Sequence, residues 1–145
     1  MADGLKIGVV GSRKFTDYRF LCDELDGCRW LWGDFTVVSG GAKGADTLAV
    51  RWANERGLPF LVFEAQWEDL SHPDALLKQR TDGTVYDVYA GFRRNQTIVD
   101  SSDKMVAFWD GISKGTASSV GRARKRGLPI YVFWPGREVR IINKR

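Results

Sequence analysis

The sequence predicts an α/β fold, a three-layer domain in which helices cover both faces of a mostly parallel, five-stranded sheet. Short, continuous apolar runs, such as residues 7–10 and 105–109, are typical of strands that are buried on both faces. Segments with helical periodicity separate these runs, and a chain that alternates strands with helices builds right-handed βαβ units. The length of 145 residues matches one domain, and we expect residues 1–145 to form it.

The elements follow one another in a regular alternation. The expected strands are 5–10, 35–39, 59–63, 104–109 and 129–134, and the expected helices are 17–30, 45–56, 91–101 and 115–126. The phrase Arg-Gly-Leu-Pro occurs twice and marks two helix ends, because glycine ends a helix and proline blocks its continuation. Numbered in chain order, the five strands are expected in the order 3-2-1-4-5, with residues 139–142 as an extra C-terminal edge strand.

Residues 64–89 interrupt this alternation and are longer than an ordinary connection. We therefore expect an insertion at about 66–89, in which only residues 74–80 are suited to a short helix. Such a segment is either a lid or binding loop or a surface decoration, and the sequence leaves both open. Its tyrosines and Trp67 are candidates for contact with a base or with a partner chain.

The composition is that of an ordinary globular protein, with 43% hydrophobic and 28% charged residues and a net charge of +4. Much of the positive excess lies near the C-terminus, at Arg122, Arg124, Lys125, Arg126, Arg137, Arg140, Lys144 and Arg145. Cations in the last turn of a helix are favoured by the helix dipole alone. A solvated basic face is thus the favoured interpretation, and nucleic-acid binding stays open.

Cysteine and histidine usage argues against a metal site. Cys22 and Cys28 lie six apart, which is not a metal-binding spacing, and His72 is the only histidine. We expect two buried free thiols and no metal ligands. No apolar run is long enough to span a bilayer, and the N-terminus leads straight into a strand without a signal peptide. We expect a cytoplasmic protein without membrane contact.

Residues 37–46 carry the most informative motif, Val-Val-Ser-Gly-Gly-Ala-Lys-Gly-Ala-Asp. A strand runs into three glycines and a lysine just before a helix. Glycines let backbone N–H groups approach an anion closely, and the N-terminus of the helix adds partial positive charge. Residues 11–13 and 110–116 repeat this pattern after two other strands. The sequence therefore predicts phosphate-binding loops, although glycines also serve tight turns.

These loops are expected to converge, because ligands of open parallel sheets bind at the carboxyl ends of the strands, where the strand order reverses. Arg13, Lys43 and Lys114 would supply charge there, and four hydroxyls would supply hydrogen bonds, those of Ser12, Ser39, Ser113 and Thr116. Residues 90–95, Ala-Gly-Phe-Arg-Arg-Asn, precede the fourth strand, and we assign Arg94 and Asn95 a ligand role over pairing with a nearby aspartate. Neither GxGxxG nor GxxxxGK[ST] is present, which argues against a classical NAD enzyme and a Walker-type NTPase.

Four motifs in one order resemble a known family. They are Gly-Ser-Arg-x-Phe-x-Asp at 11–17, Ser-Gly-Gly-Ala-x-Gly-Ala-Asp at 39–46, Ala-Gly-x-x-Arg-Asn at 90–95 and Phe-Trp-Asp-Gly-x-Ser-x-Gly-Thr at 108–116. Together they resemble the YspA-like (cpYpsA-related) branch of the SLOG superfamily, which also holds Smf/DprA and the Lonely Guy phosphoribohydrolases. The resemblance covers roughly residues 5–134 without the insertion. It implies a Rossmann-like domain that binds a nucleotide or nucleotide-derived ligand.

The chain departs from the Lonely Guy pattern where catalysis is concerned. The Gly-Thr of that pattern is present at 115–116 and Arg94 matches its arginine, but Ala-Ser-Ser at 117–119 stands where the catalytic glutamate belongs. Glycosidic cleavage needs a carboxylate near the oxocarbenium-like centre. Asp46 and Asp110 are the candidate substitutes, with Arg94 as the third catalytic candidate.

Binding of a nucleoside phosphate or ADP-ribose-like ligand, for sensing or sequestration, is therefore the favoured function. N-glycoside hydrolysis and single-stranded nucleic-acid binding of the Smf/DprA type are the alternatives. No cofactor is expected to be obligatory, although Mg²⁺ is compatible with a phosphate ligand. The resemblance implies a homo-oligomer, with Trp30, Trp32 and Trp134 as candidate interface residues. The expected ligand-binding residues are Gly11, Ser12, Arg13, Ser39, Gly40, Gly41, Ala42, Lys43, Gly44, Asp46, Arg94, Asn95, Asp110, Gly111, Ser113, Gly115 and Thr116.

Overall fold

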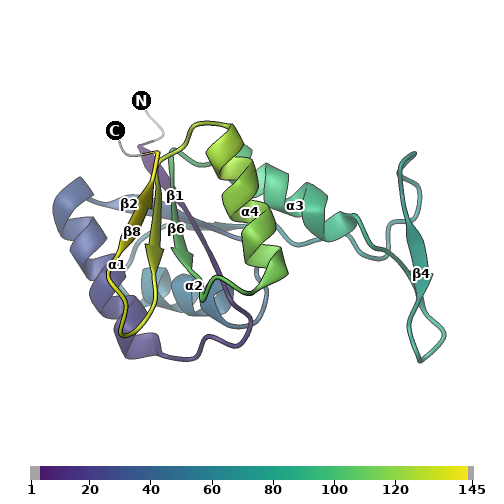
Figure 1. The fold of residues 1–145 in the computed structure, drawn as a ribbon, viewed down its shortest axis with the longest axis horizontal. Coiled ribbons are helices and arrows are strands. Elements are labelled where there is room, and N and C mark those ends of the chain that lie inside the picture. The colour runs from purple at the N-terminus through teal and green to yellow at the C-terminus, as the bar shows by residue number, and fades with distance from the viewer. Residues whose placement is uncertain (1–3, 144–145) are drawn as a thin grey trace.

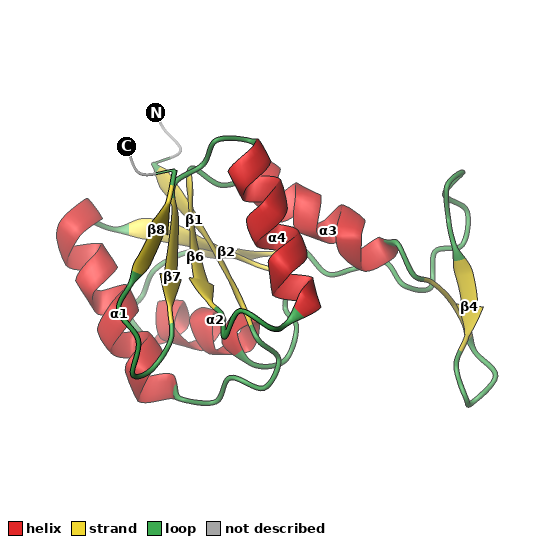
Figure 2. Cartoon of the chain, in the orientation of Figure 1, coloured by secondary structure: helices red, strands yellow, loops and turns green. Residues whose placement is uncertain are grey.

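The computed structural model describes residues 4–143 and has a six-stranded main sheet (Figure 2). Its strands are β1 (Leu5–Gly11), β2 (Phe35–Ser39), β3 (Phe60–Val62), β6 (Lys104–Phe108), β7 (Ile130–Phe133) and β8 (Arg140–Ile142). They lie in the order β3-β2-β1-β6-β7-β8, and only β8 is antiparallel to its neighbour. The predicted strand order and the predicted C-terminal edge strand are confirmed.

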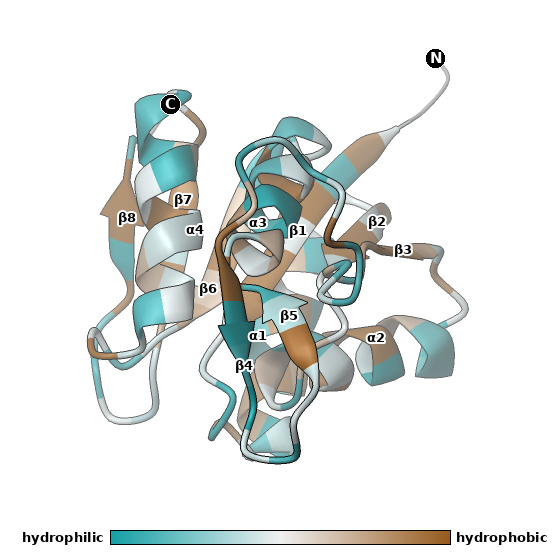
Figure 3. Ribbon diagram, turned by 90° about the vertical axis from the view of Figure 1, so that its right-hand side faces the viewer, coloured by the Kyte–Doolittle hydropathy of each residue, from teal (hydrophilic) through white to brown (hydrophobic). Residues whose placement is uncertain are grey.

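Four helices form the outer layers, α1 (Tyr18–Trp32), α2 (Ala45–Glu55), α3 (Ala90–Asp100) and α4 (Lys114–Lys125). Helices α1 and α2 cover one face of the sheet, and α3 and α4 cover the other (Figure 1). Each face has its own core. Leu21, Leu25 and Trp52 are fully buried on the first, and Ile98 and Val99 on the second. Apolar residues follow the central strands, as their hydropathy colours show (Figure 3).

The strand order reverses between β1 and β6, because the chain moves outward through β2 and β3 and then returns across β1. Two hydrogen bonds hold the loops together at this point. The Ser12 N–H donates to the carbonyl of Phe108 (3.0 Å), and the Ala45 N–H donates to the carbonyl of Ser12 (3.3 Å). The turns after β1 and β6 and the start of α2 therefore meet at one edge of the sheet, as the sequence predicts for a switch point.

The insertion contains a β-hairpin that projects beyond α3, away from the main sheet (Figure 1). Its strands are β4 (Leu77–Gln79) and β5 (Val85–Asp87). The prediction of a short helix over residues 74–80 is wrong. The reason lies in the turn, where the Asp82 carboxylate accepts hydrogen bonds from the N–H and hydroxyl of Thr84 and Gly83 has a φ of +92°. Asp-Gly between two short strands is a hairpin signal, and here it outweighs helical propensity.

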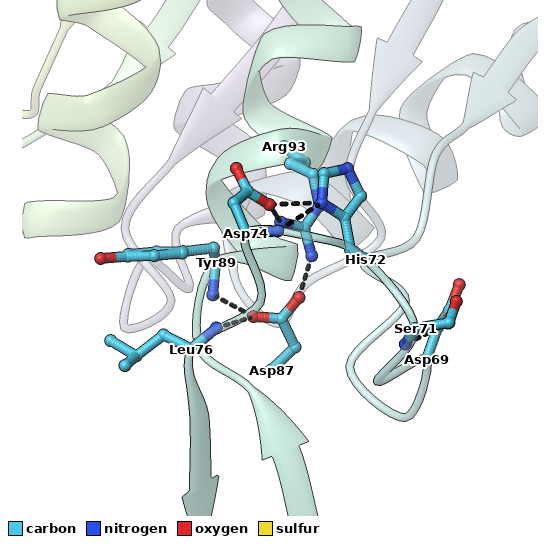
Figure 4. A network of polar contacts seen from close by, with 8 residues as sticks. All are labelled: Asp69, Ser71, His72, Asp74, Leu76, Asp87, Tyr89 and Arg93. Atoms are coloured by element: carbon cyan, nitrogen blue, oxygen red, sulfur yellow. Dashed lines mark hydrogen bonds and ion pairs between the residues drawn. The ribbon is translucent and has the colours of Figure 1, made fainter.

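A buried polar network fastens the insertion to α3 (Figure 4). The Asp87 side chain is fully buried and accepts hydrogen bonds from the N–H groups of Leu76 and Tyr89, both at 3.0 Å. Arg93 of α3 forms ion pairs with Asp87 and, at 3.0 Å, with Asp74, which also contacts His72. A buried carboxylate is stable only when it is paired and hydrogen-bonded, so this network fixes the base of the insertion.

The three candidate interface tryptophans differ in their surroundings. Trp32 packs against Tyr131 with ring centroids 5.0 Å apart, and Trp134 packs against Phe15 at 5.6 Å. Trp30 is 85% exposed. Trp32 and Trp134 therefore contribute to the core of one chain, and the predicted oligomer stays a prediction.

The two cysteines differ in their burial. Cys28 is buried, Cys22 is half-buried and neither forms a disulfide, so the prediction of two buried free thiols holds fully only for Cys28. Lys144 and Arg145 lie outside the described residues. None of the helices in residues 4–143 is long and apolar enough to cross a membrane.

Candidate functional site

A pocket of about 280 Å³ lies at the switch point, between the carboxyl ends of the central strands and the N-terminal turns of α3 and α4. Nine of the predicted ligand-binding residues line it. They are Gly11, Arg13, Ala42, Asp46, Arg94, Asn95, Ser113, Gly115 and Thr116. The four motifs of the sequence therefore meet in one place, although they are spread over about a hundred residues of the chain.

A second hollow of about 460 Å³ adjoins this pocket over the 40–43 loop. The two share Arg13, Ala42, Trp67 and Arg94, and the second adds three more predicted residues, Gly40, Gly41 and Lys43. A ligand in the first pocket would reach the glycine loop through the second. The exposed side chains of Arg13 and Lys43 form no ion pair within residues 4–143, so their charges are available to an anion.

Arg94 forms the inner wall of both hollows and is held by neutral partners. Its Nη1 donates to the carbonyl of Gly40 (2.6 Å) and its Nε donates to Oδ1 of Asn95 (3.1 Å). Burial lowers the pKa of Arg94, and the nearby carboxylate of Asp46 offsets part of that shift. Arg94 forms no ion pair within the described residues. A half-buried guanidinium that makes no direct ion pair with a carboxylate is suited to an anionic ligand.

Asp46, in the first turn of α2, is the one carboxylate that lines the smaller pocket. Its side chain is 6% exposed, and burial raises its pKa to about 6. The N–H of Ala42 donates to Oδ2 at 3.3 Å, and Arg94 and Arg13 add opposing charge, so these groups limit the rise. Asp46 is therefore a carboxyl group poised to exchange a proton near neutral pH.

Gly40 lies between the guanidinium of Arg94 and the carboxylate of Asp46. A Cβ at this position would lie 2.6 Å from Nη1 of Arg94 and 2.9 Å from Oδ2 of Asp46. The absence of a side chain lets the loop backbone pass between the guanidinium and the carboxylate. The first glycine of the motif is therefore required by close packing, in addition to any ligand.

Three helix N-termini border the pocket, those of α2, α3 and α4, and none has a side-chain cap. By contrast, α1 lies outside the pocket and is capped by Asp17, which accepts a hydrogen bond from the Phe20 N–H (3.0 Å). Ser113, Gly115 and Thr116 at the start of α4 line the pocket. Uncapped N–H groups and the positive end of the helix dipole favour an anion there.

Five predicted residues lie outside both hollows, namely Ser12, Ser39, Gly44, Asp110 and Gly111. Ser39 is buried and its hydroxyl bridges the carbonyl of Asp46 (3.1 Å) and the N–H of Gly41 (3.2 Å). Asp110 accepts hydrogen bonds from the N–H groups of Ile112 and Ser113, which lower its pKa. These residues shape the loops. Lys114 is exposed at the start of α4 and is not a lining residue.

An apolar wall completes the pocket, and sequence analysis named only one of its members, Trp67, as a candidate for contact with a base. Its members are Val10, Val88, Phe92 and Ile98, together with Trp67 from the insertion. The strand and helix positions of Val10 and Ile98 gave no reason to separate them from the core. Phe92 lies inside the predicted motif at 90–95, and that position is the one sequence signal that could have identified it; in the structure it is 40% exposed.

Within residues 4–143, no three side chains of His, Cys, Asp or Glu lie together as metal ligands. Mg²⁺ bound through the phosphate of a ligand stays a prediction.

Comparisons with known proteins show the family of the chain. Residues 5–69 match the sequence profile of the YspA, cpYpsA-related SLOG family. The Gene 61 protein of Mycobacterium phage D29 is 32% identical over 133 residues, which cover 88% of this chain and 95% of the phage protein. The chain belongs to the YspA, cpYpsA-related SLOG family.

Solved structures of other proteins share the fold. DNA processing protein A from Helicobacter pylori, for which a single-stranded DNA binding mode is described, has a TM-score of 0.64, and DprA from Streptococcus pneumoniae has 0.67. Both are 20% identical to this chain and match 89% of it, and the chain spans 65% and 50% of their respective lengths. The protein TM1055 has a TM-score of 0.59, with 20% identity over 87% of this chain and 72% of its own. At this level of identity the similarity establishes the fold alone.

Proposed function

We propose that the switch-point pocket binds a nucleotide or nucleotide-derived ligand, either a nucleoside phosphate or an ADP-ribose-like molecule. The observation that carries this proposal is that cationic and apolar side chains line one pocket. Arg13 and Arg94, which form no ion pair within the described residues, make up its cationic end, and Phe92 and Ile98 belong to its apolar wall. A phosphate-bearing ligand with an aromatic base has this same division between charged and apolar parts.

The cationic end is suited to phosphate for two reasons. Arg94 is half-buried, so its hydrogen bonds to an anion would be weakly screened by solvent. The first turn of α4, which has no side-chain cap, adds backbone N–H donors to the pocket. Thr116 and Asn95 are buried polar residues that line the same pocket, and we assign them contacts with sugar hydroxyls. The Asn95 amide already binds Arg94 and the carbonyl of Gly115.

The test is the affinity of the full chain for AMP and ADP-ribose, measured by calorimetry in the wild type and in Arg94→Gln. Glutamine keeps a donor for the Gly40 carbonyl and removes the charge. A charge-assisted hydrogen bond contributes about 1.5–3 kcal/mol, so the affinity is expected to fall about tenfold or more. Equal affinity in the two proteins would contradict the proposal.

Lys125→Gln is the matched control, because Lys125 lines a different surface. That surface is a groove of about 610 Å³ between α3 and α4, and Gln96, Arg122 and Arg126 also line it. Its positive charge favours single-stranded nucleic acid as the second candidate ligand. If that candidate is correct, Lys125→Gln weakens binding of an oligothymidylate and reduces its salt dependence, while Arg94→Gln leaves both unchanged.

Hydrolysis is measured in the same samples. Asp46 is the carboxyl group that faces the pocket, and its pKa of about 6 suits proton transfer near neutral pH. Chromatography of AMP after long incubation with folded protein separates a hydrolase, which releases adenine, from a binding protein, which returns the nucleotide intact.

A further inference from the structure

The insertion lines the pocket with two residues, and the larger of them is Trp67. Trp67 borders both hollows, whereas the hairpin of the insertion stands away from the sheet (Figure 1). Val88, at the other end of the insertion, lines the same pocket. The insertion therefore supplies part of the apolar wall, to which Ile98 of α3 also belongs.

Trp67 is held in place by the hairpin. Its carbonyl accepts a hydrogen bond from the Asp87 N–H (2.9 Å), and its ring meets Tyr86 edge to face with centroids 6.2 Å apart. The guanidinium of Arg80 lies over Tyr86 at 4.4 Å. Because the Asp87 side chain is in turn fixed by Arg93, the indole is tied to α3 as well as to the hairpin.

Helix α3 makes room for the indole at Gly91. A Cβ on Gly91 would lie 2.7 Å from Cη2 of Trp67, so a side chain at this position would displace the ring. Alanine is a better helix former than glycine, and Gly91 has ordinary helical geometry. The glycine is thus explained by the close approach of Trp67 rather than by the needs of the helix.

We propose that Trp67 is the stacking platform for the nucleobase of the ligand, and that the insertion thereby sets the specificity for base-containing over base-free phosphates. This inference rests on the proposed function. The half-buried indole borders the pocket and is fixed before any ligand enters, so little conformational entropy is lost on stacking. Phe92 lines the same pocket from the first turn of α3.

The experiment compares AMP with ribose 5-phosphate, which lacks the base. Base–aromatic stacking is expected to make AMP bind about tenfold more tightly than ribose 5-phosphate in the wild type. Trp67→Leu is expected to abolish this preference and to change the affinity for ribose 5-phosphate less than twofold. Trp67→Phe is expected to keep most of the preference. Trp30→Leu, which removes an exposed tryptophan of α1, is expected to change neither affinity.

Gly91→Ala provides a second variant that does not remove the aromatic residue. The added Cβ displaces the indole, and alanine is a good helix-forming residue, so the protein is expected to stay folded. The preference for AMP over ribose 5-phosphate is expected to fall. It decides the question if Trp67→Leu does not fold.

Two results would overturn the inference and leave the proposed function standing. They are an equal affinity of the wild type for the two probes, and an unchanged preference in Trp67→Leu or, if that variant does not fold, in Gly91→Ala. Failure of the wild type to bind either probe would overturn the proposed function together with the inference.

Discussion

Replacement of Gly44 by alanine is expected to destabilise the folded protein by about 3 kcal/mol or more. Gly44 has a φ of +83°, and a Cβ there would lie 2.2 Å from the carbonyl oxygen of Ser12 and 2.7 Å from the backbone of Arg13. Neither clash is relieved by a side-chain rotation, because both partners are backbone atoms. The substitution would force apart the two loops that carry Arg13 and Lys43. Urea unfolding followed by circular dichroism measures the effect.

Gly57→Ala is the matched control for backbone strain. Gly57 has a φ of +69°, but nothing lies within 4 Å of the position of its Cβ. The cost there is that of the left-handed conformation alone, about 1–2 kcal/mol. If the two variants lose the same stability, the contact between the loops after β1 and β2 is looser than the geometry implies.

Replacement of Asp46 by asparagine is expected to stabilise the protein at pH 7.5 by about 1–3 kcal/mol. Burial raises the pKa of Asp46 to about 6, so ionisation of this group is less favourable in the folded chain than in the unfolded chain. Asparagine has the same shape, keeps an acceptor for the Ala42 N–H and carries no charge. Thermal unfolding of both proteins from pH 3.5 to pH 7.5 tests the expectation.

The sign of the pH dependence follows from proton binding. Between the ordinary pKa of an aspartate and about 6, the folded protein binds more protons at Asp46 than the unfolded chain does. Its contribution to stability is therefore favourable below this window and is lost as the pH rises through it. The advantage of the asparagine variant should grow over the same range. A difference that does not change with pH would show that Asp46 is not desolvated.

Asp110→Asn is expected to behave in the opposite way. The N–H groups of Ile112 and Ser113 lower the pKa of Asp110, so its contribution to stability is present at neutral pH and is lost as the pH falls through the lowered value. The asparagine variant should therefore be less stable than the wild type at pH 7.5. The two aspartates that sequence analysis treats as equivalent catalytic candidates are thus separated by one titration series.

The main sheet could be predicted because its signals are local. Buried strands of four to seven residues, helix stops at Arg-Gly-Leu-Pro and glycine turns each depend on a few neighbouring residues. The hairpin was missed because residues 74–80 were considered without the Asp82-Gly83 turn that pairs them with β5. Contacts between residues far apart in the sequence, such as that of Trp67 with Gly91, leave no pattern in a single sequence and could not be predicted from it.

For the candidate site, too, the location could be predicted from local motifs, whereas the individual contacts could not. The glycine motifs predicted which loops would meet at one edge of the sheet, and nine of the predicted ligand-binding residues line the pocket. Which side chains face inward was harder to predict. Arg93 and Arg94 are adjacent, yet one pairs with Asp87 of the insertion and the other lines the pocket, since successive helix positions point in different directions. Ser39 and Asp110 are polar residues next to glycines, but both bind their own loops.

The most direct measurement of the central claim is a titration of the ¹⁵N-labelled 145-residue chain with AMP, followed by two-dimensional NMR. Binding at the switch point predicts that the perturbed amides cluster at residues 11–13, 40–46, 91–95 and 113–116. Perturbations confined to the groove of Gln96, Arg122 and Lys125 would contradict the claim and favour nucleic acid as the ligand. An unchanged spectrum at millimolar AMP, repeated with ADP-ribose, would contradict nucleotide binding at this pocket.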